Sequence, residues 1–312
     1  MSGPLVSIIT PSYNQGRFIE GTLRSVRNQE HVPVEHIVLD AGSTDETHEI
    51  LERVSGTYEL SWTVERDRGM YDAVNKGLAR ARGEIVAYLN TDDLYLPWTL
   101  ATVVEAFRRE PRAGFVYGDV IKVDEGSDLR TIVFAPPFRP AFVQRLGSLF
   151  QPAVFWRRSV LAALGSFDDS LQFGGDLDLW IRAAETHRFE KVNEVLAVER
   201  IHPAAKSSAL AGPLHEEEAR IRARYERLSP SRARISRAAE RARVWAWRRA
   251  YWLAFISASG ASKPRGNWAR FIGATHPTVR PAAALAAQLP IVGHGFASRA
   301  LDLGDPVALG LD

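Results

Sequence analysis

Residues 84–95 read EIVAYLNTDDLY, and this stretch indicates both a buried strand and a polar group at its end. A short apolar run, Ile85–Leu89, stops abruptly at Asn90-Thr91-Asp92-Asp93. Adjacent carboxylates repel each other, and each resists ionisation beside the other. No turn requires both of them. Either the pair is simply solvated, or a positive group belongs between the pair and a ligand.

The residues that precede this stretch alternate between a strand pattern and a helix pattern. Apolar, β-branched runs predict strands at 5–10, 36–39, 60–64 and 85–89. Apolar residues at helical spacing predict helices at 18–26, 45–54 and 73–79, and Pro97 opens another. Strands that alternate with short helices favour a parallel, doubly wound α/β layer.

Polar or acidic residues follow each of the four predicted strands. They are Pro11, Ser12, Tyr13 and Asn14, then Asp40, then Glu65 and Asp67, and finally Asp92 and Asp93. In an open α/β sheet, ligands bind outside the carboxyl ends of the strands. Polar groups at four strand ends along one edge therefore predict a binding site there.

The pattern changes from Gly114 onward. Strands are predicted at 115–123, 131–134 and 149–156, and a helix at 176–184. This indicates that a half with a mixed sheet follows the half with the parallel α/β layer. We therefore expect one domain over residues 1–213, with halves at about 1–113 and 114–213, and then a basic, mainly helical extension over 214–312.

Charge is distributed unevenly between the predicted domain and the extension. Residues 1–215 contain 23 Lys and Arg against 29 Asp and Glu, a net charge of −6, whereas residues 216–312 contain 16 against 8, a net charge of +8. Four of the eight Trp lie at 245–268. Arginine interleaved with aromatic residues suits an anionic lipid surface. Residues 216–260 are thus predicted to contact a membrane surface. The alternative is that this segment packs on the acidic body. No nucleic-acid partner is expected.

Composition excludes several classes of site. The chain has no cysteine, so disulfides, thiolate zinc sites and cysteine nucleophiles are excluded. The N-terminus has no secretory signal pattern, and no apolar run reaches the roughly 20 residues of a spanning helix. We expect a cytoplasmic protein that is peripheral on the inner face of the cell membrane.

Four segments, taken in order, resemble the family 2 glycosyltransferases of GT-A fold. They are ITPSYNQGRFIEGTLRSVRNQ, HIVLDAGSTDET, ERDRGMYDAVNKGLARARGEIVAYLNTDD and FGGDLDLWIRAA, and the resemblance covers roughly residues 4–208. It implies an α/β, Rossmann-like mixed sheet flanked by helices, to which this chain adds its helical C-terminal extension. It also implies transfer of a sugar from a nucleotide-sugar donor to an acceptor hydroxyl.

The resemblance implies a divalent metal at the Asp pair. A departing nucleoside diphosphate builds negative charge, which Mg²⁺ or Mn²⁺ neutralises through carboxylate ligands. Asp92 and Asp93 resemble the family's Asp-x-Asp element, so Asp93 would reach the metal and Asp92 the metal or the ribose. The family often has Asp where this chain has Asn90. His202 lies where some relatives place a histidine near the metal, although a lone histidine is more often structural.

The resemblance also implies a set of donor-binding residues. Asp40 would accept hydrogen bonds from the nucleotide base, and the small residues after it, through Ser43, would let the ligand approach. The remaining members are Pro11, Tyr13 and Asn14 in the first loop and Asp67 and Asp72 in the third. Each has a structural alternative: a helix cap for Asp40, a half-buried ring for Tyr13, and a solvated helix face for Asp72.

Asp176 is the predicted catalytic base. An acceptor hydroxyl that attacks the anomeric carbon loses its proton, and a positioned carboxylate can take it. FGGDLDLW matches the region where the family often carries Glu-Asp, with Gly175 in place of the Glu. A single displacement by such a base inverts the anomeric configuration, and no second nucleophile is evident.

Three other functions share parts of this pattern. A dehydrogenase is excluded because no G-x-G-x-x-G follows the first strand. A nucleotidyltransferase would carry a first loop rich in glycine and in Arg or Lys, whereas this chain has PSYNQG at that place. A catalytically inactive nucleotide-sugar-binding module stays open because of Gly175. The acceptor is expected to be a carbohydrate or a lipid-linked sugar of a bacterial surface polysaccharide or glycolipid.

Overall fold

A computed structural model describes residues 3–29, 32–125, 129–146 and 149–228, together with 239, 241–247 and 249. The first part of the chain alternates strands and helices, as predicted. Its elements are β1 (Val6–Ser12), α1 (Gly16–Arg27), β2 (Val34–Asp40), α2 (Thr47–Val54), β3 (Leu60–Val64), α3 (Met70–Arg80) and β4 (Ile85–Tyr88).

The second part is more irregular. Its elements are β5 (Leu94–Tyr95), α4 (Thr99–Arg109), β6 (Ala113–Asp124), β7 (Leu129–Val133), α5 (Pro140–Leu146), a 3-10 turn (Gln151–Ala153), β8 (Val154–Arg157), α6 (Ser159–Leu164), α7 (Gly175–Ala183), β9 (Arg188–Ile201), α8 (Lys206–Ala209) and α9 (Ala211–Leu228). The strand predicted at 149–156 is therefore only partly right, because Pro152 has no N–H to donate to a ladder and pairing begins at Val154.

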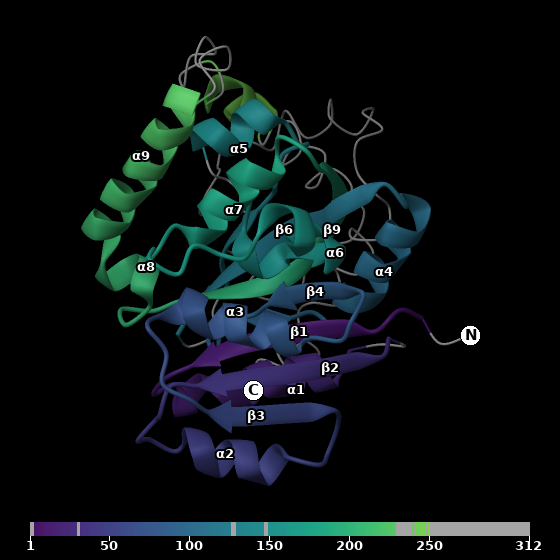
Figure 1. The fold of residues 1–312 in the computed structure, drawn as a ribbon, viewed down its shortest axis with the longest axis vertical. Helices are drawn as coiled ribbons and strands as arrows, with labels where there is room; N and C mark the ends of the chain where they lie inside the picture. Colours follow the sequence, from purple (N-terminus) through teal and green to yellow (C-terminus); the bar gives the residue numbers. More distant parts are fainter. Residues whose placement is uncertain are drawn as a thin grey trace.

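These strands form one mixed sheet with helices flanking it (Figure 1). The order is β3-β2-β1-β4-β8-β6-β9-β5, and β7 pairs with β6. Strands β1 to β4 are parallel to one another, whereas β8 is antiparallel to both β4 and β6. The predicted α/β class with a parallel first half and a mixed second half is confirmed.

The register of the parallel strands brings their carboxyl ends to one edge. Ser12 of β1 lies opposite Asp40 of β2, and Asp40 lies opposite Val64 of β3. The loops that follow these strands consequently start at the same level. This alignment is what gathers the polar residues of separate loops around one pocket.

The core explains why the strands read as continuous apolar runs. Ile37 belongs to the large core cluster, whereas the next residue, Val38, belongs to a smaller cluster with Ile19 and Leu51. Successive side chains of a strand point to opposite faces, so a sheet covered by helices on both sides needs apolar residues at every position. Each such burial stabilises the fold by about 1.5–3 kcal/mol.

Gly77 of α3 gives a test of this packing. A Cβ atom at Gly77 would lie 2.4 Å from Ile9 Cγ2 and 3.0 Å from Leu39 Cδ2. Gly77→Ala is expected to lower the free energy of unfolding by about 1–3 kcal/mol, because overpacking outweighs the better helix propensity of alanine. Urea unfolding measures the change. Gly212→Ala in α9 is the matched control, since a Cβ there meets nothing within 4 Å, and equal losses in both variants would contradict the packing argument.

The described part of the C-terminal segment is helical and touches the body. Val244 packs against the main core, and Trp247 lies 5.6 Å from Lys191 Nζ, while Trp245 is 65% exposed. About half of the segment 216–260 that we expect to contact a membrane, and all of residues 250–312, lie outside the described residues. No helix in the described ranges is long and apolar enough to cross a membrane.

Candidate active site

A pocket of about 1110 Å³ opens at the carboxyl ends of the parallel strands. Residues from widely separated loops line it. From the predicted site these are Pro11, Tyr13, Asp67, Asp92, Asp93 and Asp176. Asn14, Asp40, Ser43, Asp72 and His202 do not line it. The structure therefore brings the two metal-binding carboxylate candidates and the base candidate to one pocket, and it leaves His202 and several donor-loop candidates outside the pocket lining.

The turn that carries the two adjacent carboxylates is held from below by α1. Thr22 Oγ1 lies 2.7 Å from Thr91 O and 2.9 Å from Asp93 O. Thr22 is fully buried. A buried hydroxyl between two backbone carbonyls fixes the backbone of the turn, which in turn fixes the directions of both aspartate side chains.

Asp93 is the more buried of the two acids. It is 3% exposed, and its Oδ1 accepts a hydrogen bond of 3.2 Å from the backbone N–H of Arg200. Burial raises the pKa of Asp93 well above its usual range, and the neighbouring Asp92 raises it further. A nearby cation would reverse this effect, because an opposite charge favours the ionised carboxylate.

Asp92 faces the pocket beside a buried histidine. Its Oδ2 lies 3.0 Å from His202 Nε2, and the His202 side chain is 1% exposed. The His202 ring also lies 4.6 Å from the ring of Phe18, measured between centroids. The carboxylate of Asp92 thus lines the pocket, and the His202 nitrogen contacts it from outside the pocket lining.

These residues fit a divalent cation that takes some of its ligands from the protein and the others from a substrate. Ligands of a hexacoordinate Mg²⁺ at about 2.1 Å lie roughly 3 Å apart in neighbouring positions, which is close to the separation of Asp92 Oδ2 and His202 Nε2. The described residues contain no group of three or more His, Asp or Glu that would enclose an ion. Mg²⁺ typically takes one or two protein carboxylates plus substrate phosphates, so Asp92 and Asp93, with His202 adjacent, would suffice.

The first donor loop is tied to the second. Asn14 has a positive φ of 51°, a conformation that asparagine tolerates better than most residues. Its backbone N–H donates to Ser43 Oγ at 2.7 Å, and its Oδ1 accepts from the N–H of Thr44 at 2.8 Å. Asn14 and Ser43 therefore hold the two loops together, while Tyr13, 59% exposed, is left at the rim of the pocket.

Asp40 shapes the second loop from inside. Its Oδ1 accepts hydrogen bonds from the N–H groups of Gly42 and Ser43, and its Oδ2 accepts from Ser43 Oγ at 2.6 Å. Burial alone would raise the pKa of Asp40, but these bonds and His48, 2.7 Å away, outweigh burial and lower it. Its carboxylate is thus engaged within its own loop, and Ala41 and Gly42 line the pocket in its place.

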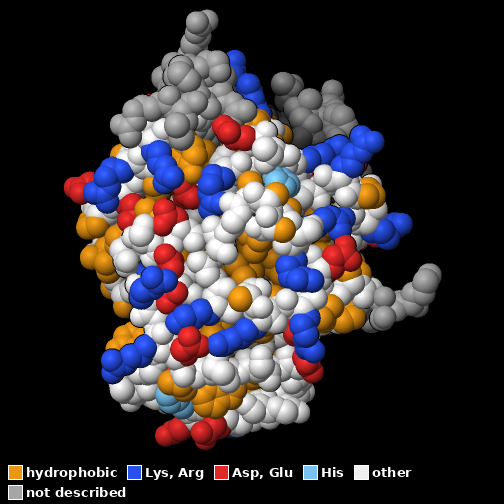
Figure 2. Space-filling view, viewed as in Figure 1, with side chains coloured by type: hydrophobic (Ala, Val, Ile, Leu, Met, Phe, Trp, Pro, Cys, Tyr) orange, Lys and Arg blue, Asp and Glu red, His pale blue; other side chains and the backbone are white. Residues whose placement is uncertain are grey.

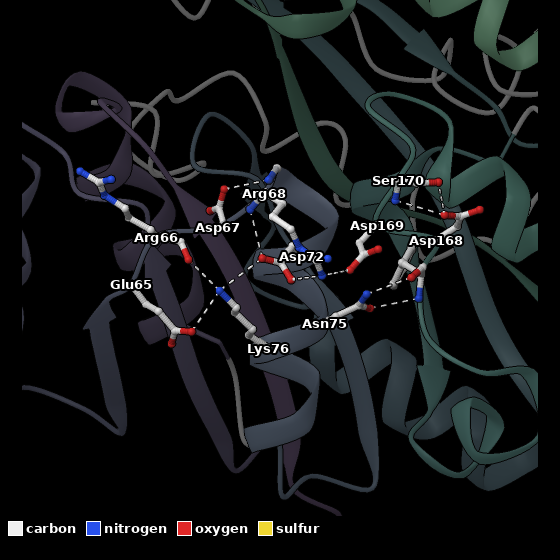
Figure 3. A network of polar contacts seen from close by, with 12 residues as sticks. Glu65, Arg66, Asp67, Arg68, Asp72, Asn75, Lys76, Asp168, Asp169 and Ser170 are labelled. Carbon is white, nitrogen blue, oxygen red and sulfur yellow. Dashed lines mark hydrogen bonds and ion pairs between the residues drawn. The ribbon is translucent and has the colours of Figure 1, made fainter.

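The third loop is braced by a network of charges (Figure 3). Asp72 pairs with Arg68 and with Lys76, each at 3.2 Å, and Arg68 also pairs with Asp169 of the loop that follows α6. Asp72 is 7% exposed and points into this network. Asp67, in contrast, lines the pocket, and burial raises its pKa.

Asp176 is the second residue of α7 and lines the same pocket as the Asp pair. Its Oδ1 accepts a hydrogen bond of 2.8 Å from the N–H of Leu177 and lies 3.4 Å from the hydroxyl of Tyr71. Burial raises the pKa of Asp176 to about 6, and nearby Glu218 contributes to the rise. A carboxylate with a pKa just below neutrality is ionised at pH 7 and still basic enough to take a proton.

Packing explains why a glycine precedes Asp176. A Cβ atom at Gly175 would lie 2.7 Å from the ring of Tyr71. That ring is buried, and its hydroxyl donates to the carbonyl of Phe173 at 2.6 Å. Tyr71 therefore fills the space that a side chain at position 175 would occupy, which explains the glycine at this position.

Asp178 and Trp180, close to the base, and Gln151 and Asn90, close to the Asp pair, have structural roles. Asp178 Oδ1 accepts from the hydroxyl of Tyr225 at 2.6 Å, and Trp180 is buried in the core. Gln151 Nε2 donates to Tyr88 O at 2.5 Å, and its Oε1 accepts from Asn90 Nδ2 at 3.2 Å. Gln151 and Asn90 line the pocket but are bonded to each other.

Comparison with known proteins settles the family. A family model described as "Glycosyl transferase family 2" matches residues 7–155. An uncharacterized glycosyltransferase of Mycobacterium tuberculosis is 31% identical over 186 residues, which cover 59% of this chain and 70% of that protein. The chain belongs to glycosyltransferase family 2. Another family relative, the putative teichuronic acid biosynthesis glycosyltransferase TuaG of Bacillus subtilis, is 38% identical over 136 residues, or 43% of this chain and 54% of TuaG.

Solved structures share the fold of this family 2 glycosyltransferase. S. aureus TarS 1-349 in complex with UDP-GlcNAc has a TM-score of 0.57 at 16% identity, over 91% of this chain and 79% of that one. The mannosyltransferase PcManGT from Pyrobaculum calidifontis, in complex with GDP-Man and Mn²⁺, has a TM-score of 0.51 at 22% identity, over 91% and 87%. The predicted GT-A fold is confirmed.

Sequence reasoning missed three residues at the site of this glycosyltransferase. Tyr71 reads as an ordinary helical aromatic, and Glu217 is one of three consecutive glutamates in HEEEAR. Lys206 lines the pocket, and burial lowers its pKa. The run RIHPAAKSS gave a signal for Lys206, since it follows the candidate histidine closely. Nothing in the sequence singles out Tyr71 or Glu217, because their partners lie far away in the chain.

Proposed function

We propose that this glycosyltransferase moves a sugar from a nucleotide-sugar donor to an acceptor hydroxyl, with a divalent metal and with inversion at the anomeric carbon. One observation carries the proposal: a single pocket holds the adjacent carboxylates Asp92 and Asp93, of which Asp93 is buried, and a separate carboxylate, Asp176, whose pKa is raised to about 6. The first set suits a leaving diphosphate, and the second suits an attacking hydroxyl.

Asp92 and Asp93 would hold Mg²⁺ or Mn²⁺, with His202 beside them. The bound ion supplies charge neutralisation for the departing diphosphate. The raised pKa of Asp93 supports this role, because a nearby cation would favour the ionised form of this buried carboxylate. PcManGT, a structural neighbour, is described in complex with Mn²⁺.

The donor would lie along the loops that follow β1, β2 and β3. Tyr13 offers an exposed ring for stacking on the base, and Ala41 and Gly42 leave space for close approach. Asp67 is the acidic group of this wall of the pocket. The neighbours described with UDP-GlcNAc and GDP-Man support a nucleotide-sugar donor here.

Asp176 would take the proton from the acceptor hydroxyl as that oxygen attacks the anomeric carbon. The bond from the sugar to the diphosphate breaks as the new glycosidic bond forms, so one displacement inverts the configuration. The acceptor would be a sugar of a surface polysaccharide or glycolipid, as the names of TuaG and of the PGL/p-HBAD biosynthesis glycosyltransferase of Mycobacterium bovis suggest for those relatives.

Release of nucleoside diphosphate from a panel of UDP-, GDP- and other nucleotide sugars, with and without Mn²⁺, tests the proposal. Release that requires the metal supports it. An inactive binding module would bind donors without releasing nucleotide. A nucleotidyltransferase would instead release pyrophosphate from a nucleoside triphosphate and a sugar phosphate.

We further propose that the basic C-terminal segment docks the enzyme on the inner face of the cell membrane, where a lipid-linked acceptor is met. On the face of the body in Figure 2, Lys and Arg are interspersed with Asp and Glu, so that face offers no uniform basic surface. The described piece of the segment carries Trp245, 65% exposed, with the guanidinium of Arg249 5.5 Å from its ring centroid.

Co-sedimentation with vesicles checks the membrane proposal. The protein is expected to bind vesicles that contain anionic lipid, because each Arg near such a surface gains about 1 kcal/mol. Binding should weaken on neutral vesicles and at high salt, since salt screens charge. No binding to anionic vesicles at low salt would leave packing on the body as the role of the segment.

A further inference from the structure

Helix α9 presents one buried stripe to the segment that carries Asp176. Glu217, Ile221 and Tyr225 follow one another at four-residue spacing and are 7%, 5% and 9% exposed. Residues four apart lie on one face of a helix. Figure 1 shows α9 beside α7, and this stripe contacts α7 and the loop that precedes it.

The Glu217 carboxylate accepts three backbone hydrogen bonds from that loop. Its Oε1 accepts from the N–H groups of Phe173 and Gly174, both at 2.8 Å, and its Oε2 accepts from Gln172 at 3.1 Å. A carboxylate makes stronger hydrogen bonds to backbone N–H groups than a neutral acceptor does. Glu217 therefore fixes the backbone that leads directly into α7.

The loop is also held on its opposite side. The Tyr71 hydroxyl donates to the carbonyl of Phe173 at 2.6 Å, while Glu217 accepts from the N–H of the same residue. A Cβ atom at Gly174 would lie 2.5 Å from Ile221 Cδ1, so α9 approaches this backbone closely. Two residues from distant parts of the chain thus hold the backbone N–H and the carbonyl of Phe173, which lies three residues before Asp176.

We propose that Glu217 is a positioning residue that sets the Asp176 carboxylate against the acceptor, and that α9 is thereby a working part of the catalytic unit. Glu217 does not line the pocket, so it acts through the loop, whereas Leu214 and Glu218 of the same helix do line it. The proposal rests on the proposed role of Asp176 as the base. It assigns a catalytic task to a helix outside the matched family region, residues 7–155.

The test compares Glu217→Ala and Glu217→Gln with Glu216→Gln in the full chain. Glu216 is the exposed neighbour on α9 and serves as the matched control. Release of nucleoside diphosphate from the donor should fall by roughly 10- to 100-fold in Glu217→Ala, because small displacements of a catalytic group cost this much. Glu217→Gln should lose less, since its amide oxygen can keep two of the three bonds. Glu216→Gln should match wild type.

Two further readouts separate positioning from general stability. Affinity for nucleoside diphosphate with Mn²⁺ should stay unchanged, because the donor loops do not touch Glu217. Hydrogen exchange should speed up at the amides of residues 172–174 and not across the sheet. The plateau of the pH–rate profile should fall while its midpoint near pH 6 stays in place.

Wild-type turnover in Glu217→Ala would overturn the proposal. So would a parallel loss of donor affinity and melting temperature in Glu217→Gln, because that result marks a purely structural role. Asp176→Asn is measured alongside. If Asp176→Asn abolishes turnover while Glu217→Ala does not, the base stands and the positioning role fails; if Asp176→Asn is active, the base assignment itself has failed.

Discussion

Replacing Asp176 with asparagine is expected to lower the rate of sugar transfer by roughly 10²- to 10⁴-fold, the loss typical of a missing general base. Asparagine keeps the shape of the side chain and can still accept the hydrogen bond from the N–H of Leu177. Affinity for the donor should barely change, because the base acts on the acceptor. Steady-state nucleotide release and donor titration measure the two quantities separately.

The pH dependence gives the same assignment a second check. Burial raises the pKa of Asp176 to about 6, and only the ionised carboxylate can take a proton. The wild-type rate should therefore fall about tenfold per unit as the pH drops below about 6 and should level off above it. Glu216→Gln, exposed on α9 and outside the pocket lining, is the control. Unchanged turnover in Asp176→Asn would remove the base role, and a large loss of donor affinity would move Asp176 to the donor side.

Replacing Asp92 with asparagine is expected to abolish the metal-dependent part of nucleotide binding. Loss of an outer-shell partner alone costs about 10- to 100-fold in metal affinity, so loss of a direct carboxylate ligand should cost more. Asp92 is the better target than Asp93, because Asp93 also holds the backbone N–H of Arg200 inside the protein. Titration of a nucleoside diphosphate with and without Mn²⁺ measures the effect.

The fold should survive this change. The Asp92 side chain is 19% exposed and has His202 as a polar partner, so asparagine can remain there without a large cavity. Its melting temperature should stay close to that of wild type. Mn²⁺-dependent binding in Asp92→Asn that equals wild type would show that the metal lies elsewhere.

The sequence predicted the parallel layer and its functional edge because both depend on local patterns. A strand buried on both faces must be apolar throughout, as Ile85–Leu89 is, and the residues that end such strands share one edge whatever the rest of the chain does. The second half was harder to predict. β9 mixes charged and apolar residues, RFEKVNEVLAVERI, and only its pairing with β6 along most of its length explains its conformation.

The direction of individual side chains in the site could not be predicted. Asp40 ends a strand at the correct edge, yet its carboxylate turns inward because Gly42, Ser43 and His48 surround it. Glu217 is indistinguishable in sequence from its neighbours Glu216 and Glu218. Its role comes from a contact across more than 40 residues of chain, which no local pattern records.

The most direct test of the central claim is a crystal structure with Mn²⁺ and the nucleoside diphosphate that the donor panel selects. We expect an anomalous difference peak for manganese within coordination distance of the Asp92 or Asp93 carboxylate. We also expect the diphosphate to bind that ion and the nucleotide base to lie against the loops after β1 and β2. Asp176 should lie across the pocket from them. A nucleotide bound elsewhere, or a manganese peak away from both aspartates, would contradict it.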